Sequence, residues 1–349
     1  MRALTVIAKQ PNSIALTERE KPAAQDGEIL ARTLAIGICG TDHEIVRGDY
    51  GEAPAGAERF VIGHESLAET VSAPRDCGIA SGDLIVGIVR RPDPIPCANC
   101  AAGEWDMCRN GLYTEWGIKG ADGYAAEYFT IDARFAVPID KRLGLTGVLL
   151  EPASIVAKAW DHIERIAART AWRPKSVLVT GAGTVGLLAA MMGVQRDLDV
   201  TLFDRVRDGI KPELALRLGA SYYTGDFAEL PLRPDVIVEC TGAPSLIVAA
   251  MDKTSRGGIV CLAGLSSGGH KMEINSEMLG RTMVLENDVV FGTVNANRRH
   301  YAMAAQALTA VDPDWLRSII TRRVPLDSWA DAFERSGDDV KTVIDFAEG

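Results

Sequence analysis

Residues 176–193 read SVLVTGAGTVGLLAAMMG. An apolar β-type run leads into three glycines with G-x-G-x-x-G spacing, Gly181, Gly183 and Gly186, and an apolar helical pattern follows. Glycine there permits a tight turn, lets a pyrophosphate approach the backbone and allows close helix-to-strand packing, while the helix N-terminus offers N–H donors to an anion. The stretch predicts the start of a dinucleotide-binding domain. A glycine turn without a ligand is the alternative interpretation.

The pattern around this stretch predicts the rest of the domain. Apolar strand-like runs and helical patterns alternate from 176 to 295, as in a doubly wound parallel sheet. Further strands are expected at 199–204, 234–240, 257–265 and 288–295, and further helices at 211–219 and 245–253.

The flanking segments have a different character. Up to about residue 153, short apolar runs broken by Gly, Pro and Asp predict an irregular β-rich domain with long loops. Beyond 295, residues 300–310 and 320–336 read as helices that return to this first domain. We therefore expect an α/β protein with a catalytic domain at 1–153, a Rossmann domain at 154–295 and a returning segment at 296–349.

Length and charge limit the functions to consider. A chain of 349 residues exceeds the usual size of one core, in agreement with two domains. The net charge of -10 and the pI near 5.1 argue against nucleic acid or an anionic membrane as the main partner, so a small molecule is expected. The opening MRALTVIAKQ is unlike a signal peptide, and no apolar run is long enough to span a bilayer. These features favour the cytoplasm.

Three of the seven cysteines form a cluster. Cys97, Cys100 and Cys108 lie in CANCAAGEWDMC, and an odd cysteine count in a reducing compartment favours metal over disulfides. Three thiolates are one ligand short of a closed structural zinc site.

The residues after the second Rossmann strand bear on the choice of dinucleotide. Asp204 ends this strand and would accept hydrogen bonds from the ribose hydroxyls of NAD. Arg205 and Arg207 follow it and would pair with the 2′-phosphate of NADP. We expect both cofactors to be used, with a preference for NADP.

Four residues of the N-terminal half offer ligands of the kinds found in catalytic zinc sites. Cys39 lies in GICGTDHE, His64 and Glu65 lie in GHES, and Glu151 lies in LLEPASIVAKAW. A thiolate, an imidazole and a carboxylate suit zinc with an open coordination position. Taken singly, each residue also has an ordinary structural explanation, as a core cysteine, a hydrogen-bonded histidine or a helix N-terminal acid.

The succession GICGTD, GHE, the cysteine cluster, EP near 151, GAGTVG and VPLDSWADAFE resembles the zinc-dependent medium-chain dehydrogenases over essentially the whole chain. Within them, the stretches 90–129 and 291–301 look most like glucose dehydrogenases of the archaeal type. The resemblance implies a GroES-like catalytic domain, a Rossmann domain and an active-site cleft between them. It also implies zinc, NADP or NAD, and a homo-oligomer, either a dimer or a tetramer.

The resemblance assigns roles to particular residues. It makes Cys39, His64 and Glu151 the catalytic zinc ligands, with Glu65 as a fourth or exchangeable one. Thr41 would bond the reacting oxygen and pass on its proton. Residues implied to hold the sugar are Glu115, Glu151, Asn295 and Thr41, with His300 or Arg90 as further candidates. Residues implied at the dinucleotide are Gly181, Gly183, Thr184, Val185, Gly186, Asp204, Arg205, Arg207, Leu265, Thr293, Val294 and Asn295.

Three positions depart from the pattern of the family. Glu44 stands where many alcohol-oxidising relatives carry a relay histidine, and His43 is displaced by one residue. Val89 stands where some sugar-specific members have a polar residue. The lobe of the family normally holds four cysteines, and in PDPIP only Asp93 has a zinc-binding side chain. We expect Asp93 as the fourth lobe ligand, with Asp106, Glu104 or a vacant knuckle as alternatives.

The function that the resemblance implies is zinc-dependent oxidation of an aldose, D-glucose above all, at C1 to the lactone, with hydride transfer to NAD(P)+. Two alternatives remain at this point. One keeps the chemistry and replaces the sugar by a polyol or a secondary alcohol. The other is an NADPH-binding zinc protein without turnover, although an abandoned site would have no need of Cys39, Thr41, His64 and Glu151 together.

Overall fold

The computed structural model describes residues 1–265, 276–334 and 337–347. The chain forms two compact units, one made of residues 1–154 and 295–349 and the other of residues 155–294. The chain passes from the first unit to the second within helix α3 (Leu150–Ala167) and leaves the second after strand β17 (Val289–Gly292).

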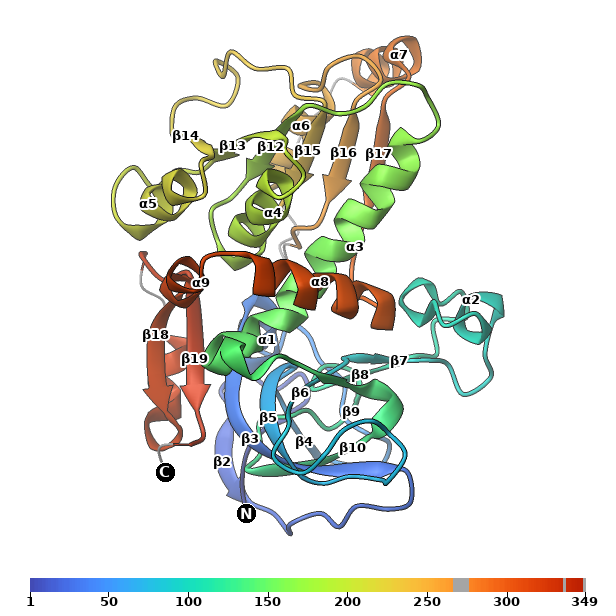
Figure 1. Cartoon of the computed structure of the whole chain (residues 1–349), viewed down its shortest axis with the longest axis vertical. Helices are drawn as coiled ribbons and strands as arrows, with labels where there is room; N and C mark the ends of the chain where they lie inside the picture. Colours follow the sequence, from blue (N-terminus) through green and yellow to red (C-terminus); the bar gives the residue numbers. More distant parts are fainter. Residues whose placement is uncertain (266–275, 335–336, 348–349) are drawn as a thin grey trace. The chain divides into compact units, whose positions relative to one another are not determined.

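The second unit is built on a six-stranded parallel sheet with the order β14-β13-β12-β15-β16-β17 (Figure 1). Counted along the chain this order is 3-2-1-4-5-6, the doubly wound arrangement of dinucleotide-binding domains, so the predicted Rossmann topology is confirmed. Its elements besides α3 and β17 are β12 (Ser176–Thr180), α4 (Thr184–Val194), β13 (Asp199–Phe203), α5 (Ile210–Arg217), β14 (Ser221–Tyr223), β15 (Val236–Glu239), α6 (Pro244–Met251), β16 (Ile259–Leu262) and α7 (Ser276–Glu286).

The glycine-rich stretch adopts the predicted strand-turn-helix. Strand β12 is central in the sheet and almost entirely buried, which explains its continuous apolar run. Gly181 turns the chain with φ of +88°, which favours glycine. A Cβ on Gly186 would lie 1.7 Å from the carbonyl oxygen of Gly181, so only glycine lets α4 approach the strand this closely.

The first unit is mainly antiparallel β-structure. Its largest sheet has the order β11-β6-β5-β3-β19-β18, with β10 also paired to β3, and two three-stranded sheets flank it. Its N-terminal elements are β1 (Arg2–Ile7), β2 (Ala15–Glu18), β3 (Glu28–Ile38), α1 (Gly40–Val46), β4 (Arg59–Val61), β5 (Glu65–Ser72), β6 (Leu84–Gly87), β7 (Arg90–Arg91), α2 (Ala98–Ala101), β8 (Thr114–Trp116), β9 (Gly120–Ala121), β10 (Tyr128–Asp132) and β11 (Ala136–Pro138).

Short 3₁₀ helices connect several of these elements. They are η1 (Trp105–Met107), η2 (Ala133–Phe135), η3 (Lys141–Leu149) and η4 (Leu326–Phe333). The returning segment adds α8 (Arg298–Ala310), α9 (Pro313–Ile319), β18 (Ile320–Pro325) and β19 (Lys341–Asp345).

The returning segment corrects one expectation. Residues 320–336 were expected to be helical, but β18 occupies 320–325 and pairs in parallel with β19, as Figure 1 shows in red. The side chains of β18 alternate between exposed and partly buried, a period of two that suits an edge strand. A short helical stretch, η4, follows Pro325, and residues 335 and 336 lie outside the described residues.

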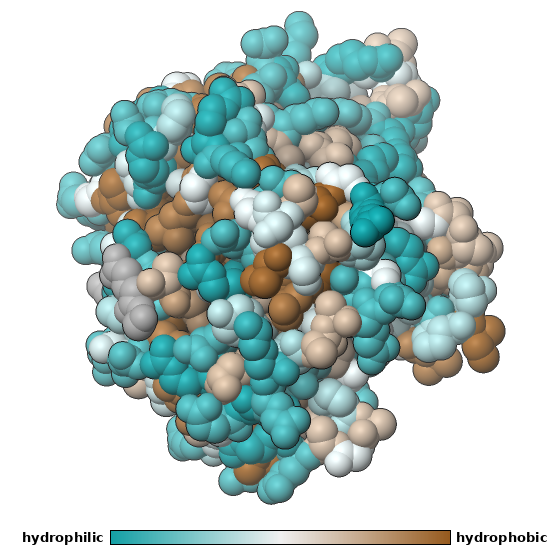
Figure 2. All heavy atoms as spheres, turned by 60° about the horizontal axis from the view of Figure 1, so that its bottom comes forward, coloured by the Kyte–Doolittle hydropathy of each residue, from teal (hydrophilic) through white to brown (hydrophobic). Residues whose placement is uncertain are grey.

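The face in Figure 2 is mostly hydrophilic, and its apolar side chains gather in small separate areas. Within the described part of the chain, no helix combines the length and the apolar character needed to cross a membrane.

Candidate functional site

Three of the predicted zinc ligands come together in the first unit. Cys39 follows β3 and precedes α1, while His64 and Glu65 lie where β5 begins. One ligand atom from each of the three residues lies within 4.8 Å of the other two. The distance from Cys39 Sγ to His64 Nε2 is 3.1 Å. The usual zinc–sulfur and zinc–nitrogen bond lengths would place the two atoms about 3.5 Å apart around a tetrahedral zinc. A small outward movement of both side chains would therefore accommodate the ion.

Asp42 orients this group, and the sequence analysis did not identify it. Its side chain is fully buried and accepts a hydrogen bond from the Cys39 backbone N–H at 2.9 Å. Its Oδ1 lies 3.4 Å from His64 Nδ1, on the ring nitrogen that faces away from Cys39. A carboxylate behind a ligating histidine fixes the ring and its tautomer. The signal was present in the sequence, since Asp42 is the N3 residue of the helix that Cys39 caps.

The electrostatics of the group suit a cation. Burial raises the pKa of the Cys39 thiol, which the neighbouring His64 lowers in part. Burial disfavours a charged imidazole, but Cys39 and Asp42 together raise the pKa of His64 well above its usual range. A divalent ion bound by both side chains would displace the Cys39 proton and favour the thiolate and the neutral imidazole, the forms that bind metal.

The two predicted glutamate ligands differ in their surroundings. Glu65 is 2% exposed and accepts hydrogen bonds from Lys341 Nζ at 2.8 and 2.6 Å. Lys341 also donates to the carbonyl of Ile38, so the strand β19 supports the cysteine-bearing loop. Glu151 lies in the first turn of α3, outside the 4.8 Å group, and burial raises its pKa to about 7, with His64 and Glu65 also acting on it.

These donors fit a zinc ion. Cys39, His64 and Glu65 offer sulfur, nitrogen and oxygen within 4.8 Å, and Asp42 supplies the outer partner that such sites carry. Glu151, whose pKa is raised to about 7, suits an exchangeable ligand, because a nearby divalent charge would favour its ionised form. Lys341 was not among the predicted residues, and its positive charge balances the carboxylate of Glu65.

The residues predicted to hold a sugar also meet in the first unit. Asn295 Nδ2 donates to Glu115 Oε1, and so do Nε and Nη2 of Arg90 at 3.1 and 2.9 Å. These three side chains are at most 8% exposed. Asn295 has a φ of +58°, a left-handed conformation that asparagine tolerates better than most residues. His300 is fully buried and lies 3.9 Å from Asp106, which makes it a structural neighbour of this group.

Thr41 and the residues at two of the departures from the family pattern lie in the first unit. Thr41 donates its backbone N–H to Cys39 Sγ at 3.3 Å and is partly exposed. The ring of His43 meets the ring of Phe333 edge to face at 5.7 Å, while Glu44 is partly buried. Val89 is 2% exposed and lies in the core.

The three lobe cysteines form a second cluster. The sulfur atoms of Cys97, Cys100 and Cys108 lie within 4.8 Å of one another. Hydrogen bonds from backbone N–H groups, that of Arg109 first, lower the pKa of Cys97 to about 6, while burial raises that of Cys100 to about 11. Asp93 lies outside this group but is 3% exposed, and its Oδ2 has no hydrogen-bond partner within the described part of the chain. A buried oxygen without a hydrogen-bond partner, in the segment that leads into the three cysteines, is the kind of group that a metal ion would satisfy.

In the second unit, the glycine turn is tied to the next strand. Asp204 follows β13 and accepts hydrogen bonds from the backbone N–H of Ala182 at 2.6 Å and of Val206 at 2.9 Å. Each carboxylate oxygen thus holds one backbone amide and retains a second lone pair. Gly183 is the N-cap of α4, whose first turn contains the predicted Thr184 and Val185.

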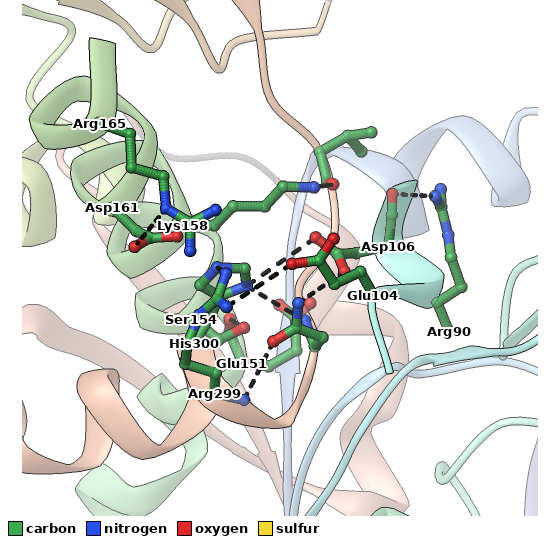
Figure 3. A network of polar contacts seen from close by, with 12 residues as sticks. Arg90, Glu104, Asp106, Glu151, Ser154, Lys158, Asp161, Arg165, Arg299 and His300 are labelled. Carbon is green, nitrogen blue, oxygen red and sulfur yellow. Dashed lines mark hydrogen bonds and ion pairs between the residues drawn. The ribbon is translucent and has the colours of Figure 1, made fainter. Parts of the chain in front are cut away.

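The remaining dinucleotide candidates lie at strand ends of the same unit. Arg205 and Arg207 are exposed, and so is Leu265 after β16. Thr293 donates its backbone N–H to Leu262, which extends the pairing of β17 with β16. Lys158, 1% exposed, donates to the carbonyl of Val294 at 3.0 Å and so fixes the end of this segment (Figure 3). Lys158 was not among the predicted residues, because in the sequence it is marked only by a charge within an apolar helix.

Two family models match the chain. Residues 25–141 match the alcohol dehydrogenase GroES-like domain, and residues 144–346 match the glucose dehydrogenase C-terminus. The first match confirms that the β-rich unit has the predicted GroES-like fold.

Curated relatives and solved structures cover almost the whole chain. The glucose 1-dehydrogenase of Methanocella arvoryzae is 36% identical over 99% of both chains, and that of Halobacterium salinarum is 37% identical over 98% of both. The structure of Haloferax mediterranei glucose dehydrogenase in complex with NADP, Zn and gluconolactone has a TM-score of 0.90, with 31% identity and 99% of both chains covered.

Proposed function

The chain belongs to the glucose dehydrogenase family of zinc-dependent medium-chain dehydrogenases, and we propose that it oxidises the C1 hydroxyl of an aldose, D-glucose above all, to the lactone. Two electrons leave C1 as a hydride that reduces NADP+ or NAD+, and the hydroxyl proton is released. The observation that carries the proposal is the convergence of Cys39, His64 and Glu65 in a chain similar over its full length to glucose 1-dehydrogenases.

The catalytic centre is assigned to residues of the first unit. Cys39, His64 and a carboxylate from Glu65 or Glu151 would hold the zinc, with Asp42 fixing the histidine ring. Zinc bound there supplies a Lewis acid that lowers the pKa of the reacting hydroxyl. Thr41 lies at the start of α1 and donates its backbone N–H to Cys39 Sγ, and we assign its hydroxyl to accept the proton of the reacting hydroxyl and to relay it.

The sugar is assigned to Glu115 and Asn295. Both side chains are buried and polar, and a site built to bond hydroxyl groups rejects molecules that lack them. Polyols have the hydroxyls but not the pyranose shape, and simple alcohols have neither. Aldoses should therefore be the better substrates.

The cofactor is assigned to the glycine turn and to the arginines after Asp204. Exposed Arg205 and Arg207 are available for a 2′-phosphate, so NADP is preferred, and NAD is also used. The Haloferax mediterranei relative with its NADP supports this assignment.

The cysteine lobe and the surface lead to three smaller proposals. Cys97, Cys100, Cys108 and Asp93 hold a structural zinc. The protein is a dimer or a tetramer, and the exposed apolar side chains of Ile95, Met107 and Leu112 on the lobe suit a subunit contact. All seven cysteines are free thiols, in keeping with a cytoplasmic protein.

A substrate panel tests the proposed function. Glucose, galactose, xylose, sorbitol and ethanol are assayed by NADPH and NADH absorbance, with and without a zinc chelator. We expect turnover of at least one aldose, much weaker turnover of sorbitol and ethanol, and loss of activity with the chelator. Cys39→Ser should abolish turnover and lower the zinc content, while Cys77→Ser, in the same unit but outside both cysteine clusters, is the matched control. Better turnover of sorbitol or ethanol than of every aldose would refute the proposal.

A further inference from the structure

Arg90 uses every nitrogen of its guanidinium in the interior of the first unit. Nε and Nη2 bind Glu115 Oε1, Nη1 donates to the backbone carbonyl of Asp106 at 2.9 Å, and the ring of Tyr113 covers one face at 3.7 Å. Figure 3 shows the guanidinium pointing at the main chain of Asp106. The Arg90 side chain is only 5% exposed, and its hydrogen bonds join Glu115 to the loop that carries Asp106.

Asp106 makes a second connection, through its side chain. Its Oδ1 accepts a hydrogen bond from Asn297 Nδ2 at 2.8 Å. Asn297 is the N-cap of α8 and lies two residues after Asn295, which donates to Glu115. The contacts close a circuit that runs from Glu115 through Arg90, Asp106, Asn297 and Asn295 back to Glu115.

Asp106 belongs to the cysteine lobe, which we define as residues 93–112. It lies in η1, two residues before Cys108, whose sulfur is in the three-cysteine cluster. The ring of Trp105 packs edge to face on Phe135 at 5.4 Å, and Asn99 Nδ2 donates to the carbonyl of Met107 at 2.7 Å. The position of η1 therefore depends on the lobe, through Asn99 and the neighbouring Cys108, and on Phe135.

The circuit leaves one oxygen of Glu115 for a ligand. Its three hydrogen bonds all end on Oε1, and the described residues donate none to Oε2. A carboxylate clamped on one side by an arginine fork presents its other oxygen in a fixed direction. That geometry is suited to accept a hydrogen bond from one sugar hydroxyl.

We propose that the cysteine lobe positions the sugar-binding pair Glu115 and Asn295, with Arg90 and Asp106 as positioning residues that do not themselves touch the sugar. The proposal rests on the proposed function, because it assigns Glu115 and Asn295 to an aldose. It gives the lobe a part in substrate affinity, in addition to its structural role.

Arg90→Lys is the first test. A lysine is a single point donor that cannot hold Glu115 and the Asp106 carbonyl together. We expect the KM for glucose to rise about tenfold, because one charge-assisted hydrogen bond that orients Glu115 is lost. The kcat should change less than about twofold, and the KM for NADP should not change. The control is Arg142→Lys, an exposed arginine forked on Asp140 in the same unit, which should change none of the three.

A swap of two side chains tests the connection to the lobe. Asn297→Asp keeps the N-cap acceptor of α8 but sets a carboxylate against that of Asp106, so the KM for glucose should again rise about tenfold. Adding Asp106→Asn restores a bond of reversed direction and should return the KM to within about threefold of the wild-type value. A purely structural defect would not be rescued in this way.

Folding and the proposed function are controlled separately. Thermal midpoints and NADP titration by fluorescence establish whether each variant is folded. If Asn297→Asp is not folded, the result for Arg90→Lys alone decides the proposal. Wild-type protein inactive on every aldose would refute the proposed function. Active wild-type protein with an unchanged glucose KM in Arg90→Lys, or an Asn297→Asp defect that Asp106→Asn does not relieve, would overturn the positioning role alone.

Discussion

At the scale of single residues, Asp204 and the two arginines after it are expected to have opposite effects on the affinity for a 2′-phosphate. The carboxylate repels a 2′-phosphate, but its oxygens already hold the amides of Ala182 and Val206, which disperses part of its charge. Arg205 and Arg207 are exposed and long enough to reach a phosphate from outside. We therefore expect a preference for NADP.

The double variant Arg205→Ala, Arg207→Ala tests this balance. We expect the ratio of kcat/KM for NADP to that for NAD to fall by about tenfold to a hundredfold, because one or two charge-assisted contacts to the phosphate disappear. The KM for glucose should not change. Arg256→Ala, an exposed arginine of the same unit, is the control. An unaltered cofactor ratio would show that the arginines do not bind the 2′-phosphate.

The metal centre shows how far single residues can be identified from sequence. Cys39, His64 and Glu65 have side chains that bind zinc, so their types alone made them candidates. Asp42 and Lys341 support the same group through buried contacts, and Lys341 lies 276 positions along the chain from Glu65. Contacts over such separations follow from the fold and have no local pattern.

At the scale of elements, the cysteine lobe combines few regular elements with a dense set of polar contacts. Its only helices are α2 and η1, so in our proposal the thiolates and a bound zinc ion supply much of its order. Asp93 supplies the fourth oxygen in our proposal, and a Cys₃Asp site would have the same charge as four thiolates.

Metal analysis of lobe variants tests this site. Wild-type protein should contain two zinc ions per chain, and the double variant Cys97→Ser, Cys100→Ser should contain one. Asp93→Asn should weaken retention of the same ion, because a neutral amide is a poorer ligand than a carboxylate. Cys39→Ser removes the other ion and serves as the reciprocal control. Two zinc ions in the double variant would exclude a lobe zinc.

Strand β18 shows why an element was assigned wrongly. The stretch ITRRVP is rich in β-branched residues, which favour a strand, but it was interpreted together with the helically spaced DSWADAFE that follows, so a helix was expected over both. In the protein β18 gains its stability from backbone pairing with β19, a partner about twenty residues further on. The strand agrees with the β-branched residues of ITRRVP, and its partner lies too far along the chain to be found from the local pattern.

At the scale of the whole molecule, the last strand of the chain completes the sheet of the first unit. Strand β19 lies between β3 and β18, pairs with β3 antiparallel from Ala35 to Ile38, and is buried along its length. It also brings Lys341 to Glu65, one of the proposed zinc ligands. The catalytic unit is therefore complete only after nearly the whole chain has been synthesised.

Ile344→Ala tests the importance of this strand. Ile344 is fully buried, so truncation should lower the free energy of unfolding by about 2 to 5 kcal/mol, the usual range for a cavity in a core. Urea unfolding followed by fluorescence measures this loss. Leu216→Ala, at an exposed leucine of α5, should change stability by less than about 0.5 kcal/mol. A loss below about 1 kcal/mol at Ile344 would show that the terminal strand contributes little.

The sequence by itself determined the doubly wound sheet, the glycine turn, the β-rich first unit and the zinc-binding residue types. Each of these depends on local patterns: continuous apolar runs, glycine spacing and the chemistry of single side chains. Only the tertiary structure decided that Glu65 lies closer to Cys39 and His64 than Glu151 does, that Asp42 and Lys341 support them, and that Arg90 joins Glu115 to the lobe. These are contacts between distant segments, and they exist only because the packed sheets exclude water and leave buried charges no other partners.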